Sequence, residues 1–252
     1  MSRNGTASRA TALKASRKRR QLHSAKSGNT GMAAPDVSRI PDNEQETSRS
    51  EAAYQGLLKI LISGELRPND VIMERRIAER LQLSRTPLRE AIRRLEGEKL
   101  ITRQSAGTLV VSPMSTEDFL NILNVRRLLE GEAVRRAASR ISLDELHKIR
   151  EQMVAVRSGI QPAGTDPNSL GRQLHQLIAE AASNPVLLSI IENLGKRTRL
   201  FMRVPERRAE VINEHLAVID ALLLRDGEGA RTAMEQHIDH LRIYILDKLS
   251  IL

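Results

Sequence analysis

The sequence predicts a mainly α-helical fold in two parts: three helices with a β-hairpin, then a C-terminal all-α bundle of six to seven helices. Apolar residues recur three and four positions apart through most of residues 48–252 of this 252-residue chain, which is the spacing of amphipathic helices. A short helix with a row of arginines follows another short helix after a tight connection. Two short apolar runs around a glycine come next and predict the hairpin. Together, the first three helices and the hairpin make a winged helix-turn-helix.

The elements of the N-terminal part each have their own sequence signals. The first helix is predicted from an apolar stripe of Tyr54, Leu57, Leu58, Leu61 and Ile62, which ends at Gly64 and Pro68. Residues 74–81 predict the second helix, and the connection 82–84 leads into the third. Strands at 100–103 and 108–111 flank a turn in which Gly107 suits the unusual backbone position.

The third helix has an apolar face and an arginine face. Leu88, Ala91, Ile92 and Leu95 recur at helical spacing, and Arg85, Arg89 and Arg93 fall four apart on another side. Ser84 and Thr86 are both suitable N-caps, and Pro87 fits the first turn. Such a helix suits a DNA major groove, because arginine grips guanine with two hydrogen bonds and a helix N-terminus attracts phosphate. A solvent-exposed amphipathic helix shares this pattern, but the flanking helix and hairpin favour DNA binding.

These segments closely resemble the GntR family of bacterial transcription regulators. The resemblance lies in residues 63–68, 83–92 and 95–96 with the wing glycine, and the Ser-Arg-Thr-Pro-x-Arg-Glu-Ala core at 84–91 is its most specific part. It implies that DNA is contacted by Arg75, Ser84, Arg85, Thr86, Pro87, Arg89, Gly107 and Thr108. Asn69 and Lys99 stand where the family usually has glycine. Asn tolerates a left-handed backbone better than Lys does, so we expect the entry to the wing to differ slightly.

The amino-acid composition limits the cellular location and the classes of partner expected for this chain. It has no Cys, which excludes disulfides and cysteine metal sites and fits a reducing cytoplasm. Together with the DNA-binding interpretation, this predicts a cytoplasmic, nucleoid-associated location. No apolar run is long enough to cross a bilayer, so no membrane partner is expected. Two Tyr and two Phe are too few for single-strand nucleic-acid binding by base stacking.

The basic charge lies mostly in an N-terminal tail. The first 50 residues hold ten Lys or Arg against four acids, which accounts for most of the net charge of +9. Residues 1–47 are polar, with little apolar clustering, and are expected to be disordered. The polybasic run 14–20 adds phosphate contacts in one interpretation and is a solubilising or misassigned-start extension in another. A transit peptide is a third, less favoured alternative.

The remaining boundaries follow from breaks in the pattern. Residues 48–112 form the winged domain, 113–116 a linker, and 117–252 the helical domain, with a capped helix start at Ser115. Helices are expected at about 116–139, 142–158, 168–182, 184–202, 206–225 and 227–250.

Polar residues on apolar helix faces mark a candidate site in the bundle. Arg126 and Glu130 border the apolar stripe of the first long helix, either as an ion pair or with Arg126 facing a cavity that takes an anionic ligand. His175, His215 and His237 lie on apolar faces of three separate helices. One such histidine is usually a core residue, but three in one bundle favour a metal site.

This half resembles the FCD ligand-binding domain that accompanies one branch of the GntR family. The resemblance covers about residues 116–240 and lies in the runs 126–130, 174–175, 184–185 and 214–215, with Asp226, Ala230, Met234 and His237. It implies a divalent metal, zinc or nickel, held by the three histidines. The family's Asp ligand stands four residues before the first His, where this chain has Gly171. Asp166 lies outside that helix and cannot replace it, so the site either keeps three His ligands or is lost.

The resemblance implies a dimeric regulator, expected to be a repressor, that binds a palindromic operator and releases it when a small organic acid enters the bundle. Two alternatives stay open: an architectural DNA binder that ignores ligands, and a three-His metalloenzyme. No general base adjoins the histidine motifs, so an enzyme is not expected.

Overall fold

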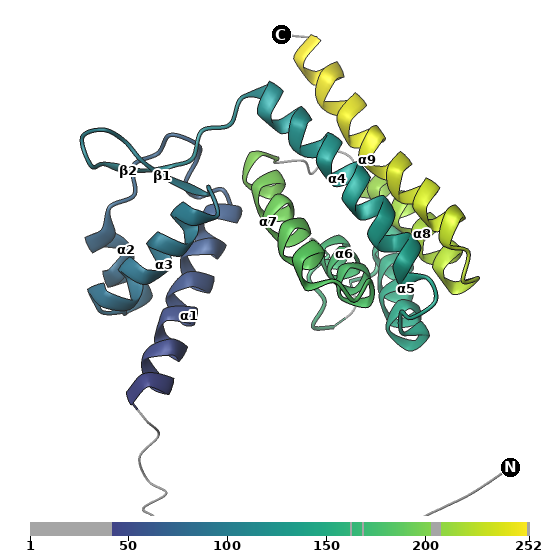
Figure 1. Ribbon diagram of the computed structural model, residues 1–252, viewed down its shortest axis with the longest axis horizontal. Coiled ribbons are helices and arrows are strands. Elements are labelled where there is room, and N and C mark those ends of the chain that lie inside the picture. Colours follow the sequence, from purple (N-terminus) through teal and green to yellow (C-terminus); the bar gives the residue numbers. More distant parts are fainter. Residues whose placement is uncertain (1–41, 162, 168, 203–207, 251–252) are drawn as a thin grey trace, which may run out of the picture. The chain divides into compact units, whose positions relative to one another are not determined.

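The computed structural model describes residues 42–161, 163–167, 169–202 and 208–250. Within them the fold is mainly helical, as the sequence predicts (Figure 1). The winged part contains α1 (Asp42–Ile62), α2 (Glu74–Leu81), α3 (Arg85–Gly97), β1 (Ile101–Arg103) and β2 (Leu109–Val111). The bundle contains α4 (Thr116–Ala137), α5 (Leu143–Arg157), α6 (Leu170–Ala181), α7 (Pro185–Phe201), α8 (Arg208–Leu223) and α9 (Gly227–Ser250).

The core of the winged part lies where α3 packs against α1 and α2. The apolar stripes expected for α1 and α3 are buried there, including Leu57, Leu61, Leu88, Ile92 and Leu95. The strands β1 and β2 pair antiparallel with Thr102 opposite Val110, and they contribute Ile101 and Val111 to the same core. Burial of these side chains fixes α3 so that its opposite, arginine-bearing face lies in solvent.

The first helix begins earlier than the composition predicts. Residues 42–47, assigned to the disordered tail, form the first turns of α1, and residues 1–41 lie outside the described part of the chain. Glu and Gln favour helix even where no apolar stripe runs, so the periodicity missed these turns. The expected boundary at residue 48 therefore falls inside α1.

The two residues that replace family glycines take left-handed backbone conformations. Asn69 has φ of 74° and Lys99 has φ of 59°, while Gly107 at the wing turn has φ of 81°. Asn adopts this region at little cost, whereas Lys does so against the clash of its Cβ with the backbone. The chain thus reaches the wing through a backbone conformation that Lys disfavours.

The bundle follows the predicted helix pattern closely. Ser115 starts α4 with a capping box, its side chain accepting a 3.0 Å hydrogen bond from the backbone N–H of Asp118. Helices α4 and α9 lie side by side along the bundle (Figure 1). The core between the six helices contains Phe119, Leu174, Ile219 and Met234 among its fully buried side chains. This packing brings polar residues from α4, α6, α8 and α9 together in the interior.

Candidate functional site

The start of α3 keeps its hydrogen-bonding groups available. Ser84 occupies the N-cap position in an extended conformation, yet its side chain makes no capping hydrogen bond. Arg85 and Thr86 follow as exposed residues, and Pro87 is buried in the first turn. The first turn of a helix presents unpaired N–H groups and a partial positive charge. This end of α3 therefore suits a phosphate oxygen.

The predicted arginine row lies in solvent. Arg85, Arg89 and Arg93 are all exposed, and Arg89 Nε donates to Glu74 at 3.3 Å. Arg75 on α2 is also exposed, with Nε 2.8 Å from Glu79. Exposed ion pairs of this kind stabilise by about 1 kcal/mol or less, so a polyanion can exchange for them. The arginines are free to serve as phosphate and base contacts.

A shallow depression collects several of the predicted DNA contacts. It has a volume of about 450 Å³ and is lined by Arg75, Ala78, Glu79, Gln82, Leu83, Ser84 and Arg85. The wing residues Gly107 and Thr108 do not line it. They sit at the hairpin turn, where Gly107 is exposed and its carbonyl accepts from Arg103 Nη1 at 3.1 Å. Arg103, at the end of β1, is a further basic residue of the wing that the sequence motifs do not predict as a DNA contact.

Inside the bundle the three predicted histidines meet. One nitrogen from each of His175, His215 and His237 lies within 4.8 Å of the others. The Nε2 atoms of His175 and His215 are 3.2 Å apart. Two nitrogens on one tetrahedral zinc are separated by about 3.3 Å, given zinc–nitrogen bonds of about 2.0 Å. The spacing of this pair therefore fits a shared metal ion.

Two carboxylates orient these rings. Glu130 on α4 is hydrogen-bonded to Nδ1 of His175, and Glu214 on α8 lies 2.8 Å from Nδ1 of His237. On His175 the contact leaves Nε2 facing Nε2 of His215, and on His237 it leaves Nε2 as the nitrogen not bound to Glu214. A carboxylate on the outer nitrogen is the usual support of a metal-binding histidine, since it fixes the ring and increases its basicity.

Burial keeps two of the three rings, those of His215 and His237, in the protonation state that metal binding needs. For His215 this effect is the larger. Burial lowers the pKa of His215 well below the usual range, and the neighbouring His237 and His175 add to this effect. Burial also lowers the pKa of His237. Neutral imidazoles have a free lone pair, so these rings are ready to act as ligands.

Arg126 lies beside the cluster and forms the ion pair that was one of its two expected roles. Its Nε donates to Glu130 Oε1 at 2.6 Å, and both side chains are buried. Burial alone would raise the pKa of Glu130, but Arg126 and His175 outweigh it and hold the pKa well below its usual range. The carboxylate therefore stays charged between a guanidinium and an imidazole. The spacing of four residues predicts that Glu130 can pair with Arg126, but no sequence pattern predicts its contact with His175.

Gly171, which replaces the family's Asp ligand, is in contact with the cluster. A Cβ on this residue would lie 2.6 Å from Cε1 of His215, closer than real atoms approach. Asp166 precedes α6, whose first residue is Leu170, and its carbonyl accepts from Ser169. No carboxylate on α6 thus takes the place of the missing ligand.

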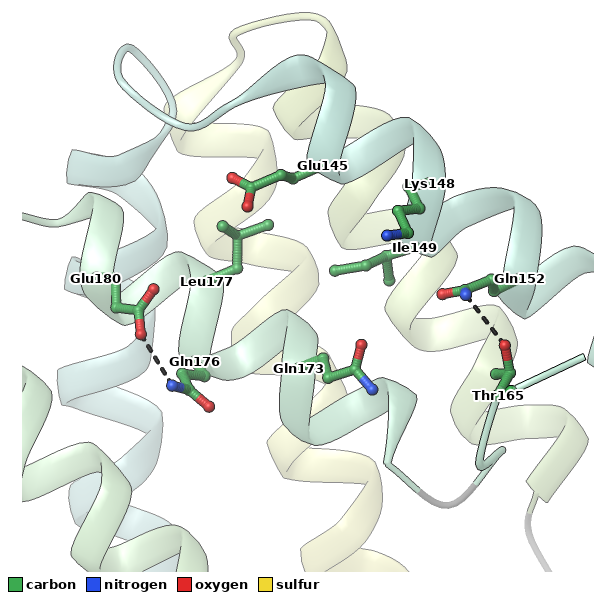
Figure 2. A pocket seen from close by; sticks show the side chains of 10 residues that line it. Glu145, Lys148, Ile149, Gln152, Thr165, Gln173, Gln176, Leu177 and Glu180 are labelled. Atoms are coloured by element: carbon green, nitrogen blue, oxygen red, sulfur yellow. Dashed lines mark hydrogen bonds between the residues drawn. The ribbon is translucent and has the colours of Figure 1, made fainter.

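A separate surface pocket of about 430 Å³ lies between α5 and α6 (Figure 2). It is lined by Glu145, Lys148, Ile149, Gln152, Gly164, Thr165, Gln173, Gln176, Leu177 and Glu180. Gln152 donates to Thr165 at 3.0 Å across one end. None of the clustered histidines or Arg126 lines this pocket, so it is distinct from the candidate metal centre.

Two family models match the two parts of the chain. The model of the bacterial regulatory proteins of the gntR family matches residues 49–111, and that of the FCD domain matches residues 121–240. None of the helices in the described residues has the length and apolar content that a membrane span needs.

Curated relatives and solved structures agree with these matches. The chain is 27% identical over 223 residues to the HTH-type transcriptional regulator YcbG of Bacillus subtilis, covering 81% of this chain and 93% of that protein. The HTH-type transcriptional repressor RspR of Escherichia coli is 26% identical over 200 residues, with 76% and 86% covered. The E. coli McbR/YncC structure shares the fold, with a TM-score of 0.68 at 24% identity over 80% of this chain and 98% of that one.

One further relative has higher identity. An operon regulatory protein of E. coli is 30% identical over 196 residues, covering 66% of this chain and 73% of that protein. Together with the two family matches, this relationship shows that the chain belongs to the GntR family of bacterial regulatory proteins, as a transcriptional regulator with an FCD domain and not an enzyme.

Proposed function

We propose that the protein is a dimeric, ligand-responsive repressor that binds a palindromic operator in double-stranded DNA. Residues 48–112 bind DNA in this proposal, and residues 117–252 bind the effector and hold the dimer together. The observation that carries it is the exposed row of Arg85, Arg89 and Arg93 beside an uncapped helix start. Repression is proposed because RspR, a relative over most of its length, is a transcriptional repressor by name.

The DNA contacts divide into two groups by chemistry. Arg85 and Arg89 reach base edges from α3, since a guanidinium can bond two guanine acceptors at once. Ser84, Thr86, Pro87 and Arg75 position α3 through backbone phosphates, and Gly107 with Thr108 bring the wing to the minor groove. One such surface reads one half-site, so a palindrome calls for a second copy of the chain.

The helical domain holds a divalent metal, zinc or nickel, at His175, His215 and His237. Support comes from the 3.2 Å spacing of two candidate ligand nitrogens, the lowered pKa values of His215 and His237, and the two orienting carboxylates. Three protein ligands leave a coordination position open. A metal held by these three residues would supply a Lewis-acid site to which a carboxylate of a small organic acid would bind.

Binding of the acid shifts the dimer from its DNA-binding arrangement. A ligand changes such an equilibrium only by the difference in its affinity for the two arrangements. Operator affinity therefore falls with effector concentration and reaches a plateau.

Fluorescence anisotropy on an operator obtained by in vitro selection tests the proposal. The dimer should bind the selected duplex at least 1,000-fold more tightly than random duplex, the lower end of the range for specific regulators. Exchanging Arg85 and Arg89 for Ala should remove this preference, and exchanging the exposed Arg140 should not. Equal affinity of the unaltered protein for selected and random duplexes would overturn it.

Metal analysis of protein purified without a nickel column tests the metal centre. One zinc or nickel per chain is expected, with loss of metal in the His237→Ala variant. A parent protein with no stoichiometric metal, even after incubation with zinc and desalting, excludes the site.

A further inference from the structure

The charged side chain of the wing is bound to the protein's own surface. Arg103 is the only charged residue between positions 100 and 111. Its Nε donates to Oε1 of Glu96 at 3.2 Å, and its Nη2 donates to Oε2 of the same carboxylate at 3.4 Å. Its Nη1 donates to the backbone carbonyl of Gly107 at 3.1 Å. The guanidinium therefore joins the last turn of α3 to the turn of the wing, and we call this set of contacts the Arg103 bridge.

The base and the tip of the hairpin differ in how they are held. At the base, Ile101 and Val111 are buried in the core, and the backbone N–H of Ser112 donates to the carbonyl of Leu100 at 3.0 Å. Residues 104–107 at the tip are exposed, so burial does not fix their position. A hairpin of two short strands is only marginally stable by itself. Contacts between the tip and the helices therefore determine how firmly the tip stays in place.

Backbone hydrogen bonds give the tip its shape. The N–H of Gly107 donates to the carbonyl of Gln104 at 2.8 Å, and the N–H of Gln104 donates to the carbonyl of Thr108 at 2.9 Å. Gly107 has a φ of 81°, as expected for the residue that closes a three-residue hairpin loop. These bonds lie within the hairpin, so they do not fix its angle to α3. The Arg103 bridge does, because it connects the same turn to Glu96.

Direct contact with DNA is the alternative role for Arg103. The side chain of Arg103 is 47% exposed, but that of Glu96, at 24%, lies against it. A carboxylate in this position repels a phosphate, so it opposes the alternative role. The same carboxylate is required for a bridge between α3 and the wing. Arginine suits that bridge, since its planar group binds both oxygens of a carboxylate and still has a nitrogen for a further acceptor.

We propose that Arg103 is a positioning residue, which holds the wing at a fixed angle to α3 through Glu96 and the carbonyl of Gly107. With this angle fixed, Gly107 and Thr108 approach the minor groove while α3 lies in the adjacent major groove. The inference rests on the proposed function in that the wing approaches DNA. The Arg103 bridge itself belongs to the protein without DNA.

NMR relaxation of the full-length protein, produced with isotope-labelled glycine, tests the bridge without DNA. Glu96→Met and Arg103→Met should each lower the order parameter of the Gly107 N–H from about 0.85, the value of rigid backbone, to about 0.6 or less. Glu132→Met is the matched control, because Glu132 also receives two hydrogen bonds from one arginine, Arg135, but lies on α4. It should leave the order parameter of Gly107 unchanged. An unchanged value in both wing variants overturns the inference.

Operator affinity separates positioning from phosphate contact. Positioning predicts that Glu96→Met and Arg103→Met each weaken binding to the selected operator by about fivefold, near the upper limit for an exposed ion pair. Phosphate contact predicts opposite signs, with tighter binding by Glu96→Met because an acid beside the DNA is removed. Arg103→Lys keeps the charge without the planar group, so it should bind as weakly as Arg103→Met. Tighter binding by Glu96→Met, or full affinity of Arg103→Lys, overturns the inference.

Footprints at saturating protein show which part of the operator is affected. In Glu96→Met, protection of the minor groove from hydroxyl radicals should be lost beside the wing, while protection of guanine N7 by α3 in the major groove remains. Equal loss in both grooves would mean a general disturbance of the domain and contradicts the positioning role.

Failure of the inference can be told apart from failure of the proposed function. A wild-type protein without preference for its operator contradicts the proposed function, and the order parameter of Gly107 still decides whether the Arg103 bridge holds the wing. Wild-type operator binding, together with variants that keep the wild-type order parameter and footprint, contradicts the positioning role alone.

Discussion

Gly171 on α6 lies directly against the ring of His215 on α8, with 2.6 Å between the Cβ position of the glycine and Cε1 of the histidine. The missing side chain is therefore part of what sets the position of this imidazole. A residue with a Cβ at 171 must displace His215 from the cluster, since backbone on one side and a buried ring on the other leave no space.

The first prediction follows from this contact. Gly171→Ala should weaken zinc binding by about tenfold, comparable with the loss of a group that orients a ligand. Competition with a zinc-binding dye measures the affinity. Gly97→Ala is the control, because a Cβ there meets nothing within 4 Å. Unchanged zinc affinity in the 171 variant would show that the ring lies elsewhere when metal is bound.

The second prediction concerns the buried pair of Arg126 and Glu130. Glu130→Gln should lower the free energy of unfolding by about 3 kcal/mol, because it leaves the guanidinium of Arg126 buried without its anion. Urea denaturation in EDTA measures this without any contribution from metal. Glu132, half-buried on the same helix and paired with Arg135, is the control, and its exchange for Gln should cost about 1 kcal/mol or less. Equal losses of unfolding free energy in the two variants would show that burial does not increase the contribution of the pair Arg126 and Glu130 to stability.

The third prediction concerns base reading by α3. Arg85→Ala should weaken binding to the selected operator by roughly 1–3 kcal/mol and relax the preference at one base pair. Anisotropy titrations against operators with single base-pair changes locate that position. An equal loss on operator and random duplex would assign Arg85 to phosphate contact instead.

The fourth prediction concerns the backbone before the wing. Lys99→Gly should stabilise the protein by about 1 kcal/mol, because glycine adopts the φ of 59° without the clash of a Cβ. Lys99→Ala keeps the clash and removes the same long side chain, so it should be close to neutral. Urea unfolding of both variants gives the comparison, and a destabilised glycine variant would contradict the strain.

Sequence patterns predicted most of the fold, since each helix has its own apolar stripe and its own end signals. Residues 74–81 illustrate this, because the predicted helix and α2 have the same bounds. The start of α1 was not predicted, because the prediction relied on apolar stripes and residues 42–47 have none.

The candidate site was predictable only in part. The three histidines recur at helical spacing with apolar residues, so the sequence alone predicts that they face the bundle interior. In the structure their side chains lie close together. The contact of Glu130 with His175 depends on how α4 packs on α6, which no local pattern encodes.

The placement of Glu130 also determines how a change in the bundle could be transmitted along the chain. Glu130 is in α4, an uninterrupted helix that starts at Thr116, shortly after the last wing strand ends at Val111. A helix transmits displacement along its axis with little loss, because its hydrogen-bonded turns resist compression. Under the proposed effector response, a displacement of the His175 ring moves α4 as one unit, and residues 112–115 are the whole connection between that unit and the wing strand β2.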